Sequence, residues 1–146
     1  MSISDFERAI NEIPDMLVIS EPLYINGYIN CKPVKILIDT GASSSIIYNS
    51  TINRLNLNDK VDSTYKTLLS GIGLEVSVGR IWYTNLQMSD YNFPVSLVVS
   101  NNDINNIDII LGMNFLKACN AILDLKNMML QIKINNKKIN INFSSE

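Results

Sequence analysis

Hydrophobic residues along the 146-residue chain fall in short apolar or alternating runs, a pattern typical of many short strands and few helices. Near the start, Ser4-Asp5-Phe6-Glu7 has the S-x-x-E spacing of a capping box, and Phe6, Ile10 and Ile13 follow at helical spacing before Pro14. We therefore expect a short amphipathic helix there. This divides the chain into an N-terminal helical extension, residues 1–16, and one β-rich domain, residues 17–146.

Strand signals continue through the middle of the chain. Two apolar stretches, residues 17–29 and 34–39, predict a hairpin with a turn at residues 30–33, which contain the turn formers Asn and Pro. Residues 68–88 are apolar or β-branched between glycines, so we expect two strands with a flexible tip at Gly71-Ile72-Gly73. This glycine-tipped hairpin is a candidate flap, although an ordinary hairpin would show the same pattern.

The second half repeats a plan seen in the first. An apolar strand at 36–41 ends in glycine and is followed by helical residues near 50–57, and residues 108–112 also end in glycine before a helix at 113–118. Between them, the apolar continuity of residues 93–99 predicts a strand buried on both faces, and we expect Trp82 and Tyr83 in the core. Alternation in residues 130–134 and 139–143 predicts a final hairpin with a turn at Asn135-Asn136.

Composition and charge narrow the class of protein. With 47% hydrophobic residues, a chain of this length can bury one core, so we expect one domain. A net charge of -2 and a pI of about 5.1 argue against a nucleic-acid binder, because phosphate binding needs clustered Lys and Arg. No apolar run reaches the roughly 18 residues that a membrane span requires, so we expect a soluble protein.

Histidine is absent from the sequence, which removes hydrolases with a histidine base and most zinc sites. Carboxylates remain as the candidate catalytic groups, and we expect neither a metal nor another cofactor. Cys31 and Cys119, in a chain without a signal peptide, predict reduced thiols in the cytosol rather than a disulfide.

Asp39-Thr40-Gly41-Ala42 directly follows an apolar run and carries the candidate chemistry. A carboxylate that activates water needs a rigid strand end behind it, so that packing fixes its rotamer. Thr40 offers a small hydroxyl that can bond to a facing copy of the loop, and Gly41 lets the backbone approach a partner without a Cβ in the way. The same residue types are also common in ordinary turns after strands.

Peptide hydrolysis by this route needs two carboxylates about 3 Å apart that share one proton, because like charges at that distance cannot both ionise. Only one D-[ST]-G occurs in the chain. We therefore expect a homodimer in which Asp39 of each chain forms the dyad. Asp103 and Asp108 are its rivals, but Asp103 lacks a glycine and hydroxyl neighbour and Asp108 precedes its strand. We assign Asp108 a structural polar contact instead.

The motif belongs to an ordered series of segments, which are N-E-I-P at 11–14, L-Y-I-N at 23–26, V-K-I-L-I-D-T-G-A at 34–42, G-I-G at 71–73, V-G-R-I at 78–81, D-I-I-L-G at 108–112 and I-L-D-L at 122–125. By these segments, within residues 7–131, the chain resembles the retroviral-like aspartic proteases. It is most similar to the protease domain of the DNA-damage-inducible protein family of ubiquitin receptors.

The resemblance implies a mainly β, retropepsin-like acid protease fold. Each monomer would be one closed β-rich domain with a short N-terminal helix and one or two short helices, in a homodimer. The resemblance also places Ser43 and Ser44 along the substrate backbone and Gly71, Ile72 and Gly73 at the tip of a flap over the substrate. Many viral members carry acidic residues after the motif, and serines cannot form the same ion-paired support.

By the same resemblance, Asp39 is catalytic, Thr40-Gly41-Ala42 support it, and the protein is a cytoplasmic aspartic endopeptidase. Its substrates would be proteins or peptides, with ubiquitinated proteins among the candidates. Relatives in this branch usually carry a ubiquitin-like domain before the protease domain and sometimes a ubiquitin-binding helix bundle after it. Neither fits in these 146 residues, which suits an excised domain, a protein that has lost targeting by ubiquitin recognition, and one that obtains it through partners.

Other interpretations stay open. The fold could serve as a catalytically silent dimerisation or peptide-binding module, or the chain could be the protease domain of a retroelement polyprotein. The intact motif favours the enzyme, since a silent module has no need for a carboxylate whose repulsion with its mate costs stability. The family also builds much of its dimer interface from C-terminal strands, which would place it at residues 139–143. The alternative is an edge hairpin that covers its own subunit.

Overall fold

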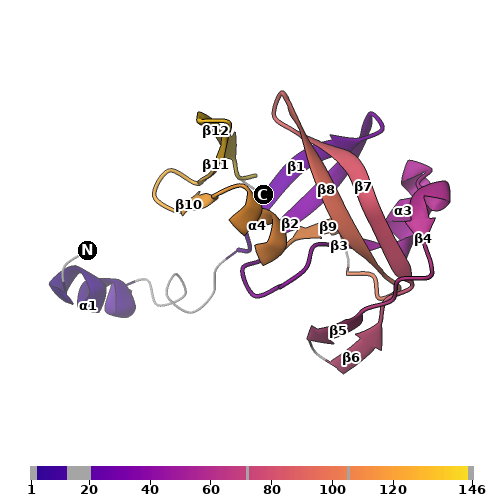
Figure 1. The fold of residues 1–146 in the computed structure, drawn as a ribbon. Helices are drawn as coiled ribbons and strands as arrows, with labels where there is room; N and C mark the ends of the chain where they lie inside the picture. The colour runs from indigo at the N-terminus through magenta and orange to yellow at the C-terminus, as the bar shows by residue number, and fades with distance from the viewer. Residues whose placement is uncertain (1–2, 13–20, 72, 105, 145–146) are drawn as a thin grey trace.

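Most of the chain is β-structure. The computed structural model describes residues 3–12, 21–71, 73–104 and 106–144, and their strands form three sheets (Figure 1). The largest sheet contains β1 (Tyr24–Ile29), β2 (Lys32–Ile38), β3 (Ile46–Tyr48), β4 (Val61–Asp62), β7 (Gly79–Met88), β8 (Tyr91–Ser100) and β9 (Ile109–Leu111). Its strand order is β1-β2-β9-β3-β8-β7-β4.

A second pairing closes this sheet into a barrel. Strand β1 also pairs with β7, where Gly27 lies opposite Met88 and Tyr28 opposite Gln87. At the seam, a Cβ on Gly27 would lie 2.6 Å from the carbonyl oxygen of Gln87, so the two backbones meet this closely only with glycine at that position. The predicted mainly β, closed fold is therefore confirmed for the monomer.

Two smaller sheets and short helices complete the fold. The smaller sheets are the three-stranded β10 (Ile122–Asp124), β11 (Met129–Ile134) and β12 (Lys137–Asn142), and the hairpin of β5 (Leu68–Gly71) and β6 (Gly73–Val76). The helices are α1 (Ile3–Glu12), α3 (Asn49–Leu55), the 3-10 turn η1 (Asn58–Lys60) and α4 (Met113–Ala118). None of the helices in the described ranges has the length and hydropathy that a membrane crossing requires.

The hairpin that leads to Asp39 is tighter than predicted. Its turn contains only Asn30 and Cys31, both at positive φ (50° and 62°), and Ile29 lies opposite Lys32. Pro33, expected in the turn, instead lies inside β2, outside the stretch 36–38 that pairs with β9. Residues 21–23 are not strand, while residues 17–20 lie outside the described residues. Two residues in left-handed conformation suffice to reverse the chain, which is why the strand begins early.

The core fills the barrel and the space under the three-stranded sheet, with fully buried side chains that include Ile25, Ile36, Ile47, Ile52, Leu55, Ile81, Leu86, Phe93, Leu97, Ile109, Leu111, Leu130 and Ile132. Strand β8 is continuously buried only over residues 97–100, and its first half alternates between buried and exposed. The prediction of burial on both faces is thus wrong for residues 93–96. Strand β8 has β3 as its second pairing partner only from Val98 onward.

Trp82 and Tyr83 were expected in the core, and this expectation is wrong, because their side chains are 50% and 54% exposed. The physical reason is a β-bulge. The pairing of β7 with β8 shifts register between Ile81 and Thr84, and these two residues are both buried. Because the extra residue breaks the inside-outside alternation, two successive aromatic side chains face solvent.

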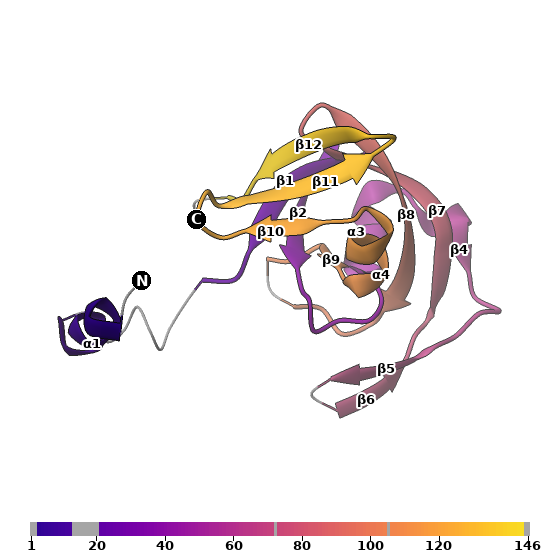
Figure 2. The same ribbon diagram turned by 60° about the vertical axis from the view of Figure 1, so that its left-hand side comes forward.

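At the two ends of the chain, the predicted elements are present with small changes. Helix α1 begins at Ile3, so Ser4 lies inside the helix rather than at its cap, and Phe6 and Ile10 are exposed. Ile13 and Pro14 lie outside the described residues. Figures 1 and 2 both draw α1 apart from the barrel.

The final hairpin has its predicted turn at Asn135-Asn136, both at positive φ. The apolar side chains Ile139, Ile141 and Phe143 are buried in the core of their own subunit. These three side chains pack on their own subunit, and the placement of a dimer interface at residues 139–143 stays a prediction.

Candidate active site

Asp39 lies where the buried strand β2 ends. Strand β2 is held between β1 and β9, and its side chains Ile36 and Ile38 point into the core. The Asp39 backbone N–H donates to the carbonyl oxygen of Leu111 at 3.1 Å, which ties it to the end of β9. Its side chain is partly exposed. The carboxylate is therefore presented to solvent from a backbone that strand pairing holds on both sides.

The loop after β2 orients this carboxylate. The Gly41 N–H donates to Asp39 Oδ1 at 2.8 Å, and the Ala42 N–H donates to the Asp39 carbonyl oxygen at 3.3 Å. A Cβ on Gly41 would lie 3.2 Å from Asp39 Oδ1, which is a tight contact. Glycine therefore lets its amide approach the carboxylate and hold it in one orientation. Thr40, the other predicted supporting residue, is exposed at the tip of the loop.

A second loop, at the end of β9, braces the first. The Met113 N–H donates to the Ala42 carbonyl oxygen at 2.7 Å, and the Asn114 N–H donates to that of Ser43 at 3.3 Å. Gly112 lies against this backbone, since a Cβ there would collide with the carbonyl oxygen of Ser44 and lie 2.6 Å from that of Ala42. The two strand-glycine units recognised in the sequence thus meet at the site.

Ser45 joins the two loops through its side chain. Its buried hydroxyl accepts from the Gly112 N–H at 3.0 Å and donates to Asn114 Oδ1 at 2.8 Å. Sequence reasoning missed both Ser45 and Asn114. The available signals were a hydroxyl residue directly before the buried strand β3 and an amide residue two positions after Gly112.

The predicted substrate-binding residues fall into two groups. Ser43 is exposed and Ser44 partly exposed in the loop after Asp39. Gly71 and Gly73 lie opposite each other at the end of the β5–β6 hairpin, while Ile72 is outside the described residues. Figures 1 and 2 show this hairpin projecting from the end of the barrel where the loop after β2 also lies. Within the described residues, the hydrogen bonds of Asp39 go to Gly41, Ala42 and Leu111, none of which belongs to the hairpin.

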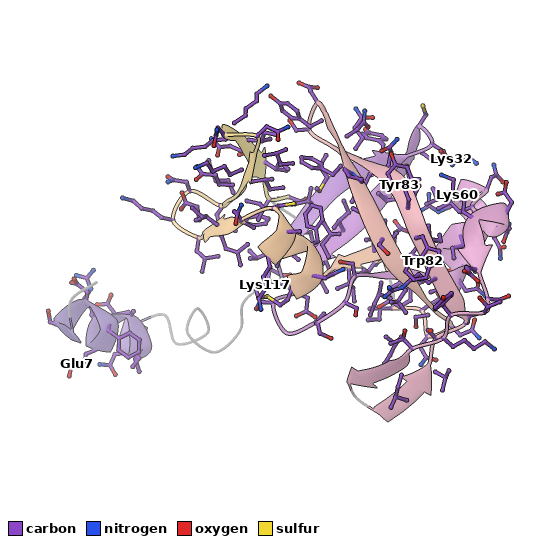
Figure 3. All side chains as sticks on the ribbon, viewed as in Figure 1. Glu7, Lys32, Lys60, Trp82, Tyr83 and Lys117 are labelled. Carbon is purple, nitrogen blue, oxygen red and sulfur yellow. The ribbon has the colours of Figure 1, made fainter. Side chains whose placement is uncertain are left out.

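Three of the hollows on the surface of the described residues adjoin the loop that carries Asp39. One, of about 580 Å³, is lined by Asp39 and Thr40 together with Glu21, Pro22, Leu23, Leu37, Ile38, Leu123 and Leu125. A second, of about 320 Å³, shares Thr40 and is bordered by α4, on which Lys117 stands (Figure 3), and a third, of about 440 Å³, lies between Thr40, Gly41 and Ser43 and the same helix. A larger hollow of about 940 Å³ surrounds Asp108, at a distance from the Asp39 loop along β2. Leu125, in the lining of the first hollow, is exposed.

Asp108 has the structural role predicted for it. Its carboxylate accepts from the Lys35 N–H at 2.8 Å, from Thr51 Oγ1 at 2.9 Å and from Arg54 Nη2 at 2.7 Å. Asp103 accepts from Ser50 Oγ at 2.9 Å. Asp108 therefore fastens α3 to β2 and β9, and the interpretation of Asp108 as a structural residue is confirmed.

In the described part of the chain, three titrating groups have pKa values shifted from their ordinary ones. Hydrogen bonds from Thr64 and Trp82 hold the pKa of the Asp62 carboxyl below its ordinary value, and hydrogen bonds from Asn127 do the same for the pKa of Asp124. Burial raises the pKa of the Cys119 thiol. Cys119 and the exposed Cys31 are both free. Within the described ranges, no group of three or more Cys, Asp or Glu side chains is placed to bind a metal ion.

Comparisons with known proteins agree with this geometry. DNA damage-inducible protein 1 of Saccharomyces cerevisiae is 32% identical over 125 residues, which are 86% of this chain and 28% of that protein. The protein of the same name from Eremothecium gossypii is 30% identical over 125 residues, 86% of this chain and 26% of that protein. The chain thus spans about a quarter of the length of these curated relatives.

A solved structure and a family model complete the comparison. The crystal structure of the retroviral protease-like domain of Ddi1 from Leishmania major superposes with a TM-score of 0.72 at 29% identity, covering 87% of this chain and 99% of that one. The sequence model described as "Aspartyl protease" matches residues 14–124, a range that contains both braced loops. The chain belongs to the aspartyl protease family and has the retroviral protease-like fold.

Proposed function

We propose that the protein is an aspartic endopeptidase whose dyad is formed across a homodimer by Asp39 of each chain. The observation that carries this proposal is the Asp39 carboxylate, oriented by the Gly41 amide in a loop that Gly112, from the other half of the domain, braces through the Ser45 hydroxyl. Each chain supplies one such loop. A second chain related by a twofold axis would supply the other, with the same patch used on both subunits.

The chemistry follows from two carboxylates in contact. Two Asp39 side chains about 3 Å apart would hold one proton between them. The ionised one takes a proton from a water molecule while the water attacks the peptide carbonyl carbon, and the protonated one polarises the carbonyl oxygen. The Gly41 amide keeps its carboxylate in one orientation during this exchange, which is the kind of positioning that hydrolysis requires.

The surroundings of Asp39 support a partner chain and an extended substrate. The hollow beside Asp39 is lined mostly by apolar residues, among them Leu125, which is 63% exposed. Burial of such side chains is the main source of stability in dimer interfaces. In this proposal the β5–β6 hairpin serves as a flap, with Gly71-Ile72-Gly73 over the substrate and Ser43 and Ser44 along its backbone.

We propose proteins or peptides as substrates, with ubiquitinated proteins among the candidates, and a cytoplasmic location. Both come from the sequence resemblance. The free cysteines, one exposed and one buried, are compatible with a reducing compartment.

A subunit-mixing experiment tests the proposal. Wild-type chain at fixed concentration is mixed with increasing Asp39→Asn chain, and cleavage of an unstructured protein is followed at acidic and neutral pH alongside the mass in solution. If each site needs two Asp39 carboxylates, mixed dimers are inactive and the added variant suppresses wild-type activity. Asp103→Asn chain, added as the control, should leave the activity unsuppressed.

Other outcomes would contradict the proposal in different ways. A monomeric mass at high concentration together with full activity would refute the shared dyad. Wild-type activity no greater than that of Asp39→Asn under every condition would favour the silent peptide-binding module with the same fold.

A further inference from the structure

An exposed aromatic patch, made of Tyr65, Trp82 and Tyr83, lies on the outer side of β7. The bulge between Ile81 and Thr84 places Trp82 and Tyr83 on the surface, and Tyr65, which is 58% exposed, reaches them from the segment before β5. Figure 3 places Trp82, Tyr83 and Lys60 together on this side of the barrel. Large aromatic side chains gathered on a surface commonly mark interaction sites.

Within the patch, Trp82 is held in one position although half of its side chain faces solvent. Its Nε1–H donates to Asp62 Oδ2 at 3.0 Å, and its ring meets that of Tyr65 edge-on, with centroids 4.9 Å apart. Tyr83 is fixed in a similar way, because its hydroxyl donates to Asn85 Oδ1 at 2.8 Å. Ordered aromatic side chains lose little conformational freedom on binding, so they are suited to anchor a partner.

Positive charge accompanies the rings. The Arg80 guanidinium lies 5.0 Å from the centre of the Trp82 ring, and the Lys60 ammonium lies 5.8 Å from that of Tyr83. Within the described residues, ion pairs join Arg8 to Glu12 and Arg54 to Asp108, and none involves Arg80 or Lys60. The patch thus holds two cations, Arg80 and Lys60, and one carboxylate, Asp62, which bonds to the Trp82 indole and forms no ion pair with either cation within the described residues.

We propose that this aromatic patch is a docking surface for an extended acidic segment of a partner protein. Apolar or proline side chains of the segment would pack on Trp82 and Tyr83, and its carboxylates would pair with Arg80 and Lys60. A single-stranded nucleic acid also stacks on aromatic rings, but it needs a row of cations along its backbone, which a chain of net charge -2 with two cations here does not offer. The docking does not depend on the chemistry of Asp39.

Trp82 is the only tryptophan in the sequence, so the tryptophan fluorescence of the protein comes from this patch alone. The experiment titrates Asp39→Asn chain, which cannot cleave the probe, with a short synthetic peptide in which Glu alternates with Pro, Leu or Tyr. We expect a saturable change in tryptophan fluorescence that weakens with salt. The same peptide with Lys in place of Glu, and a single-stranded oligothymidine, should produce no saturable change.

Matched variants locate the response. Arg80→Gln and Tyr83→Ala should each weaken binding of the acidic peptide about tenfold, as truncation of an interface anchor does. Lys126→Gln removes an exposed cation in the turn after β10, and Tyr28→Ala removes an exposed tyrosine of β1; both should bind like the parent. Thermal unfolding of each variant checks that the fold is retained.

The proposal is overturned if the acidic peptide gives no saturable response, if the control variants weaken binding as much as Arg80→Gln, or if the oligothymidine binds more tightly than the peptide. The last result would instead make the patch a nucleic-acid surface.

Discussion

Ser77 and Thr67 are joined by two hydrogen bonds at the base of the β5–β6 hairpin. The Ser77 N–H donates to the Thr67 carbonyl oxygen at 2.8 Å, and the Thr67 N–H donates to Ser77 Oγ at 2.7 Å. Ser77 is buried, and the N–H of the next residue, Val78, donates to the carbonyl oxygen of Val99 at 2.9 Å. This pair fixes the point from which the hairpin projects, so its loss should alter the hairpin more than the barrel.

Ser77→Ala removes the acceptor of the Thr67 N–H. We expect the free energy of unfolding to fall by about 1 kcal/mol and kcat/KM for a peptide substrate to fall severalfold, because a hairpin with a loosened base closes less well over the substrate. Denaturant titration and initial rates measure the two effects. Ser96→Ala is the matched control, since its hydroxyl bonds to the Ile81 carbonyl oxygen away from the hairpin. Equal kcat/KM in both variants would remove the hairpin from the mechanism.

Gly112→Ala tests the brace behind Asp39. The added methyl group would meet the backbone carbonyls of Ala42 and Ser44, which cannot rotate away as a side chain does. We expect a loss of stability of about 1–3 kcal/mol and a fall in kcat for the protein that remains folded, because the loop that holds Asp39 must shift. Met113→Leu, which conserves volume at the next position, should have little effect on either quantity. Full kcat in the glycine variant would show that the brace does not position the carboxylate.

Asp108→Asn separates structural from catalytic carboxylates. The variant keeps the shape of the side chain but weakens its bonds to Thr51 and Arg54, so we expect the free energy of unfolding to fall by about 1–3 kcal/mol. Activity per folded molecule should be unchanged, as it should be in Asp103→Asn, which loses only the bond from Ser50. If the Asp108→Asn variant is fully folded and still loses activity, Asp108 would again be a candidate catalytic carboxylate.

The sequence predicted best those features that depend only on neighbouring residues. The D-T-G loop, the helix at 113–118 and the Asn135-Asn136 turn lie where the sequence predicted them, because strand ends, helical spacing and left-handed turns are local properties. A hydrogen bond between distant segments leaves no local pattern in the sequence. The bond between Ser45 and Asn114 was therefore not predicted. Trp82 and Tyr83 were misplaced because hydrophobicity suggests burial, whereas a one-residue shift in strand register decided their direction.

The turn between β10 and β11 should make stability depend on acid pH. Hydrogen bonds from Asn127 lower the pKa of the Asp124 carboxyl in the folded chain below its ordinary value of 3.8. A carboxyl whose pKa is lower in the folded chain than in the unfolded chain stabilises the fold at pH values above its unfolded pKa. This stabilisation is lost as the pH falls through the pKa of the folded chain.

Asn127→Ala should therefore reduce stability at neutral pH and flatten the acid decline of the melting temperature. Lys126→Gln, in the same turn, should keep the wild-type acid profile. A wild-type acid profile in Asn127→Ala would contradict the assignment.

The Gly112 amide donates to the buried hydroxyl of Ser45, where the loops after β2 and β9 meet. Because Gly112 and Ser45 are both buried, we expect this amide proton to exchange with deuterated solvent as slowly as those of the core strands. In such a molecule the carboxylate cannot lose its alignment by partial fraying, and heat should abolish catalysis and tertiary structure in a single cooperative event.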